Sequence, residues 1–146
     1  MSSPESSPEN GYEPITVDDD AGVRAWGPTL GAAFAEAATG VFARMLDPAS
    51  VEARDSREVR AQGHPVETLL VTWINECLYV HEIEGFVVRR VDVDTCDGGL
   101  VHGTLFGEEV DHDRHRLTAA IKAATGRGVE VSGSEGRWRV RVLLER

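Results

Sequence analysis

The sequence predicts one α+β domain in which two helices pack against a largely antiparallel sheet. The chain of 146 residues is long enough for one hydrophobic core and short for two. Its content of 41% apolar and 27% charged residues is typical of a soluble globular protein. Two stretches with helical periodicity lie among short alternating segments, which is the pattern of helices packed on a sheet.

The composition of the N-terminal segment predicts a disordered tail. From Met1 to Glu13 the chain is rich in Ser, Pro, Glu, Asn and Gly and offers almost nothing to bury. The entropy lost on ordering such a segment would go uncompensated. We therefore expect residues 1–13 to be disordered and residues 14–146 to form the domain.

A strand and a helix follow. Gly22 to Trp26 alternates in character and ends at a Gly-Pro turn, which predicts a short strand. Thr29 can cap the helix that comes next, and Asp47-Pro48 ends its pattern. Its apolar residues recur at spacings of three and four and are Leu30, Phe34, Ala37, Val41, Phe42 and Met45.

The second helix has the strongest pattern. After a strand around Arg57 to Ala61, it opens at Pro65. One broad stripe is apolar, as expected of a helix with a buried face, and comprises Val66, Leu69, Leu70, Trp73, Ile74, Cys77 and Leu78.

The second half of the chain predicts more strands. Phe86 to Asp94 and Leu100 to Phe106 form a predicted hairpin. Trp138 to Leu144 is a last strand with Arg137, Arg139 and Arg141 facing outward. Leu117 to Thr125 is ambiguous, since its alanines favour helix whereas its apolar residues also alternate as in a strand.

The composition of the chain disfavours several classes of function. A net charge of −10 disfavours tight nucleic-acid binding, which depends on Lys and Arg neutralising phosphates. It suits a basic protein partner or metal cations instead. The two cysteines form no CxxC motif, and the chain has neither a long apolar run nor a signal-peptide pattern. We expect a cytoplasmic protein without a membrane anchor.

Several blocks of sequence resemble the archease family. They are GVRAWGPTLGAAFAEAATGVFARMLDPASVEARDSREV, ETLLVTWINECLYVHEIEGFVVRRVDV, LFGEEVDHDRHRL and IKAAT. These blocks follow the family's order and spacing over nearly all of the chain after Ile15. The resemblance implies a compact strand-helix-strand-strand module with an inserted segment. It also decides in favour of a strand for Leu117 to Thr125.

The resemblance implies a function. Archeases are accessory proteins, not enzymes, that promote guanylylation and repeated turnover of an RtcB-type RNA ligase, which seals tRNA exon halves and other broken RNAs. Family members carry a metal site that is assigned to calcium. On this resemblance the expected partner is an RtcB-type ligase and the expected cofactor is a divalent metal, most simply calcium.

The family's functional positions align with four residues here. Asp20 and Glu145 take the places of the acidic metal ligands, and Arg146 offers a main-chain carbonyl. Lys122 takes the place of the functional lysine. Two departures stand out: Val17 and Asp18 replace a His-Thr pair, and Gly126-Arg127 replaces a Tyr-His pair.

The chemistry of these residues supports a functional role, but each of them also has a simpler interpretation. The run Asp18 to Asp20 offers carboxylate oxygens that suit calcium or magnesium, but could be a solvated acidic loop. Lys122 is the single lysine among 15 basic residues, so an ammonium at this place is distinctive. The alternative is an ordinary surface lysine.

Other patterns in the sequence are weaker evidence for a functional site. Asp111, His112, Asp113 and His115 resemble a transition-metal set, but a solvated loop is the simpler interpretation. His64, His81 and His102 each stand alone, which favours packing or capping. No Ser-His-Asp order or phosphate loop is present. Two rival functions remain: an archease-like binding module for another nucleic-acid-processing enzyme, and a metal-dependent hydrolase built on Asp18 to Asp20.

Overall fold

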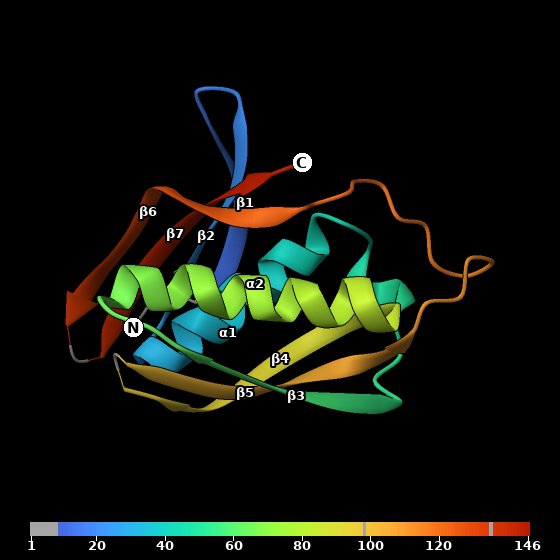
Figure 1. Cartoon of the computed structure of the whole chain (residues 1–146), viewed down its shortest axis with the longest axis horizontal. Coiled ribbons are helices and arrows are strands. Elements are labelled where there is room, and N and C mark those ends of the chain that lie inside the picture. The colour runs from blue at the N-terminus through green and yellow to red at the C-terminus, as the bar shows by residue number, and fades with distance from the viewer. Residues whose placement is uncertain (1–8, 98, 135) are drawn as a thin grey trace, which may run out of the picture.

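The predicted α+β class is confirmed. The computed structural model describes residues 9–97, 99–134 and 136–146. In this part of the chain two helices lie between two antiparallel sheets, so the expected sheet is divided in two (Figure 1). None of the described helices is long and apolar enough to span a membrane.

The larger sheet joins the two ends of the described chain. It contains β1 (Gly11–Val17), β2 (Asp20–Gly27), β6 (Ala123–Ser134) and β7 (Arg137–Glu145) in the order β1-β2-β7-β6. All neighbouring strands are antiparallel. The first and last strands predicted from sequence are thus direct neighbours, and Figure 1 shows β2 (blue) running beside β7 (red).

The smaller sheet has the order β3-β5-β4. Its strands are β3 (Asp55–Gln62), β4 (Phe86–Cys96) and β5 (Leu100–Glu109). The antiparallel pairing of β4 with β5 confirms the predicted hairpin.

The helices supply the middle of the core. In α1 (Leu30–Ala43) the side chain of Thr29 accepts the N–H of Ala32 at 3.0 Å, as the predicted cap requires. A short 3-10 helix, Pro48–Ser50, follows. Inside the core, the indole of Trp73 in α2 (Val66–Glu84) donates to the carbonyl of Phe34 in α1 at 3.0 Å. This bond satisfies a buried donor and ties the two helices together.

Two predictions from the sequence need correction. Residues 11–13, expected in the tail, belong to β1; residues 1–8 lie outside the described part. Residues 117–122 form neither strand nor helix, and β6 starts only at Ala123. In this segment Thr118 gives its N–H to the carbonyl of Met45, at 2.7 Å, so a long-range bond replaces a strand ladder.

Candidate functional site

The acidic run lies at a hairpin turn. Asp18 and Asp19 have φ values of 49° and 73°, and Val17 pairs with Asp20 across them. Two residues with positive φ are the requirement of a type I′ turn, and aspartate is among the residues that tolerate this conformation. Asp18 and Asp19 therefore make the turn, and Asp20 is the first residue of β2.

Asp20 and Glu145 come to the same end of one strand pair. The pairing of β2 with β7 stops at Gly22 and Leu143. Gly22 is two residues after Asp20, and Leu143 is two residues before Glu145. Alternation along each strand puts both acidic residues on the sheet face that carries Gly22 and Leu143. The expectation that Glu145 lies on a strand adjacent to that of Asp20 is met.

The main chain of Lys122 lies at the same end of the sheet as Asp20 and Glu145. Its N–H bonds to the carbonyl of Glu145 at 2.8 Å, next to the pairing of Ala123 with Glu145. The Lys122 side chain is exposed and makes no ion pair with any carboxylate in the described ranges. Arg146 is exposed beside Glu145. The structure thus brings the four residues to one sheet end without joining their charged groups.

Arg127 holds the carboxylate of Asp20. The pairing of β6 with β7 is irregular between Thr125 and Glu130, and Arg127 lies in this bulge. Its Nη2 donates to Oδ2 of Asp20 at 2.6 Å, across the intervening strand β7. Bulges commonly redirect a side chain, and this one directs a guanidinium toward Asp20. The sequence singled out Arg127 as a departure from the family but did not reveal its partner.

The donor types suit a hard cation. Calcium and magnesium take carboxylate and main-chain carbonyl oxygens, which Asp20, Glu145 and Arg146 can supply. Among the residues that the structure describes, however, no three His, Cys, Asp or Glu side chains are grouped as metal ligands. A bound ion would have to take the Asp20 carboxylate from Arg127.

The loop after β5 is held by a buried charge network. Glu108, with a side chain only 6% exposed, accepts from Arg114 at 2.7 Å and from the N–H of Glu52 at 2.8 Å. His115 accepts the N–H of Asp111 at Nδ1, so its proton sits on Nε2 and donates to Glu108 at 2.9 Å. The Arg114 guanidinium is the main cause that lowers the pKa of Glu108 to about 2.

This network accounts for the histidine- and aspartate-rich loop. Asp111 accepts from the N–H of Asp113 at 3.0 Å and from Arg114 at 3.2 Å. The ring of His115 is used at both nitrogens by protein groups. These contacts organise the loop itself, and Glu108, the residue at their centre, carried no signal in the sequence beyond its position at the end of a strand.

His102 is not isolated, contrary to the prediction. Its Nδ1 lies 2.8 Å from Asp94 and its Nε2 lies 3.0 Å from Glu58. The Asp94 carboxylate, followed by that of Glu58, raises the pKa of the imidazole. The three residues come from β4, β5 and β3, so only the sheet pairing brings them together.

Comparison with known proteins gives a consistent result. Residues 12–145 match the model of the Archease protein family. "Protein archease" of Methanothermobacter thermautotrophicus is 33% identical over 138 residues, which is 92% of this chain and 98% of that protein. "Protein archease" of Thermococcus gammatolerans is 34% identical over 123 residues, covering 82% of this chain and 87% of that protein.

A solved structure agrees in fold. The solution structure of Methanobacterium thermoautotrophicum protein 1598 superimposes with a TM-score of 0.74 at 33% sequence identity. The match covers 93% of this chain and 99% of that one.

Proposed function

This chain belongs to the archease family, and on that premise we propose that it is a cytoplasmic, non-catalytic accessory protein that activates an RtcB-type RNA ligase in tRNA splicing or RNA repair. The observation that carries the proposal is the meeting of Asp20, Glu145 and Lys122 at one end of the larger sheet. On the family resemblance these residues would take the functional positions of archeases, and Asp20 and Glu145 come from opposite ends of the described chain.

In this proposal the sheet end presents two kinds of positive charge to the ligase. Asp20, Glu145 and the carbonyl of Arg146 would hold a divalent cation, most simply calcium, which supplies a point charge that can polarise a phosphate. Lys122, exposed and outside any ion pair of the described ranges, would extend its ammonium to the same surface of the ligase. The accessory protein favours one state of the ligase by contacts that differ between states.

The direct test is multiple-turnover RNA ligation by the ligase of the same organism. Asp20→Ala and Lys122→Ala are each expected to lower the stimulated rate about tenfold or more, while single-turnover ligation by pre-guanylylated ligase stays unchanged. Lys122→Arg separates charge from shape, because a guanidinium is planar and less strongly hydrated than an ammonium.

Asp113→Ala is the matched control, since this exposed aspartate lies in the loop after β5 and its carboxylate makes no bond in the described part. Equal stimulation by the wild-type protein and by the Asp20 and Lys122 variants would reject the site.

A second candidate function rests on the altered residues at this edge. Arg127 neutralises the proposed ligand Asp20, and Val17 and Asp18 also depart from the family pattern. These changes favour a binding module that serves a different nucleic-acid-processing enzyme. A pull-down with the tagged chain distinguishes the two: recovery of the RtcB-type ligase supports activation, and recovery of another nucleic-acid enzyme with no ligase supports the alternative.

A further inference from the structure

We propose that His102 is a pH-sensitive link across the smaller sheet, which holds the edge strand β3 while the imidazole is protonated and loosens it when the proton is lost. From the central strand β5 the ring contacts Asp94 of β4 at 2.8 Å and Glu58 of β3 at 3.0 Å. His102 thus connects all three strands through side chains. The link goes beyond the proposed function, because no residue of the Asp20 end takes part in it.

The geometry of the two contacts requires a charged ring. An ionised carboxylate only accepts hydrogen bonds, and a neutral imidazole has one donor nitrogen and one acceptor nitrogen. Each ring nitrogen of His102 lies at hydrogen-bond distance from a carboxylate. Both bonds therefore form only when both nitrogens carry a proton. A neutral ring would turn a lone pair toward one of the carboxylates and lose that bond.

The contact with Asp94 is the firmer of the two. The pairing of β4 with β5 is irregular between Val93 and Thr95, so Asp94 lies in a bulge, and bulges commonly redirect a side chain. Asp94 makes the shorter contact and is the main cause of the raised pKa of the imidazole. The Glu58 side chain is 77% exposed and can turn into solvent. A neutral ring is therefore expected to keep its proton toward Asp94 and to release Glu58.

The other charged groups near the ring do not cancel these contacts. Arg60 of β3 is directly opposite His102 in the strand pairing, and its positive charge opposes protonation of the ring. On β4, Asp92 lies on the same face and is paired with Arg90 at 2.7 Å. The helices lie against the other face of the sheet (Figure 1). The two carboxylates bonded to the ring outweigh the effect of Arg60, since the pKa of His102 is raised.

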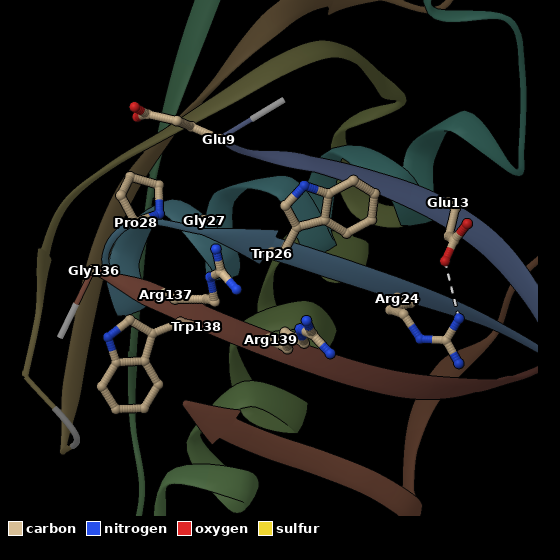
Figure 2. Close-up of a pocket in the computed structure, with 10 residues that line it drawn as sticks. All are labelled: Glu9, Glu13, Arg24, Trp26, Gly27, Pro28, Gly136, Arg137, Trp138 and Arg139. Atoms are coloured by element: carbon tan, nitrogen blue, oxygen red, sulfur yellow. Dashed lines mark hydrogen bonds and ion pairs between the residues drawn. The ribbon is translucent and has the colours of Figure 1, made fainter. Parts of the chain in front are cut away.

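The larger sheet has a comparable contact that does not depend on the protonation of a histidine. Arg24 of β2 bonds to Glu13 of β1 at 2.9 Å, and the two residues are directly opposite each other in the strand pairing (Figure 2). A guanidinium stays protonated throughout the physiological pH range. β1 is an edge strand, as β3 is, and can therefore serve as an internal reference for it.

The direction of the pH dependence follows from the raised pKa of His102. A group whose pKa is higher in the folded protein stabilises the fold fully below its ordinary pKa, here 6.5. This stabilisation is lost as the pH rises through the pKa of the folded state. β3 is therefore held most firmly at about pH 6 and loosens above neutral pH. Loosening of β3 uncovers the edge of β5, which is otherwise paired with it.

The test is amide hydrogen exchange of the full-length protein at pH 6 and pH 8.5, with each rate corrected for the intrinsic exchange rate at that pH. The protection of residues 57–61 is expected to fall about two- to fivefold between the two pH values, the modest factor typical of an exposed ionic contact. His102→Gln and Glu58→Gln should show the lower protection at both pH values. In a proton NMR titration, Asp94→Asn should lower the pKa of His102 more than Glu58→Gln does.

His112→Gln is the matched control, because it removes an exposed histidine from the loop after β5, and this variant should keep the pH dependence of the wild-type protein. The proposal is overturned if His102→Gln still loses protection between pH 6 and pH 8.5, or if β1 loses protection by the same factor as β3. Equal protection of β3 at both pH values in the wild-type protein also overturns it. Glu58→Gln changes only an exposed side chain, so the test remains decisive if His102→Gln does not fold.

Discussion

Glu108 shows how one buried carboxylate organises a loop. Glu108 and His115 are the two buried polar side chains among the residues that the structure describes. Arg114 compensates the buried charge, and His115 and the N–H of Glu52 fill the remaining acceptor positions. Each partner lies in a segment without regular structure, so the carboxylate holds the loop after β5 and the loop before β3 in place.

Glu108→Gln is expected to lower the free energy of unfolding by about 1–3 kcal/mol at pH 7, because the buried carboxylate loses its charge-assisted hydrogen bonds from Arg114 and His115. The dependence on pH follows from the pKa of Glu108, which is about 2 in the folded protein and ordinarily 4.5. A lowered pKa stabilises the fold above pH 4.5, and this stabilisation is lost as the pH falls from 4.5 toward 2. Urea denaturation at pH 7, 5 and 3 measures it.

The neighbouring Glu109→Gln is the control, since Glu109 is exposed at the end of the same strand. Its effect should be small at every pH. A difference between wild type and Glu108→Gln that stays constant from pH 7 to pH 3 would contradict the role of the ionised carboxylate.

At the scale of elements, α2 replaces a missing strand partner for β6. Asn75 accepts the N–H of Ala124 at 2.7 Å and donates to its carbonyl at 3.4 Å. These are main-chain groups at the start of an edge strand, where the ladder offers partners on one side only. Lys122 lies two residues before Ala124. Asn75 therefore also helps to hold the main chain next to the proposed functional lysine.

Asn75→Ala is expected to loosen the start of β6, since it leaves the N–H of Ala124 without a partner. Amide hydrogen exchange of residues 123–125 should become about tenfold faster, and the free energy of unfolding should fall by about 1–2 kcal/mol. Glu76→Ala, an exposed neighbour on the same helix, should leave this exchange unchanged. Unchanged exchange in Asn75→Ala would show that the ladder with β7 alone holds the strand.

At the scale of the whole molecule, the proposed site combines residues from near the two ends of the described chain. Asp20 lies near the start of the described chain and Glu145 near its end, and Arg127 reaches Asp20 from a third strand. An ion bound between the two carboxylates would therefore resist separation of β2 from β7. An exposed ion pair such as Arg127–Asp20 contributes little to stability, so a divalent cation can displace the guanidinium.

If calcium occupies the proposed site, calcium at about 100 times its Kd is expected to raise the free energy of unfolding by about 2.7 kcal/mol, because that site exists in the folded state alone. Asp20→Ala should abolish this effect. Arg127→Ala should bind calcium about two- to fivefold tighter, since the competing guanidinium is gone. Calorimetric titration and thermal unfolding with and without calcium measure both quantities.

Arg116→Ala removes an exposed arginine of the loop and is the control for net charge. Its calcium affinity should equal that of the wild-type protein. Weaker calcium binding by Arg127→Ala would show that the guanidinium supports the ion instead of competing with it.

The amino-acid sequence by itself determined the local elements. The cap at Thr29, the apolar stripe of α2 and the β4–β5 hairpin depend on residues close together in the chain, and all three were predicted. The family resemblance likewise came from ordered local blocks. It marked Asp20, Glu145 and Lys122, which local chemistry alone would have left as an acidic loop, a terminal glutamate and a surface lysine.

Only the tertiary structure decided which distant groups meet. The irregular residues 117–122, the Arg127–Asp20 pair and the pairing of His102 with Glu58 all depend on contacts between residues far apart in sequence. Such contacts leave no periodicity, because a hydrogen bond or an ion pair needs one partner at the right place in space and no repeating pattern. The strand predicted across Leu117 to Thr125 is confirmed for residues 123–125 and wrong for residues 117–122, where the N–H of Thr118 bonds to the carbonyl of Met45 and not to a strand.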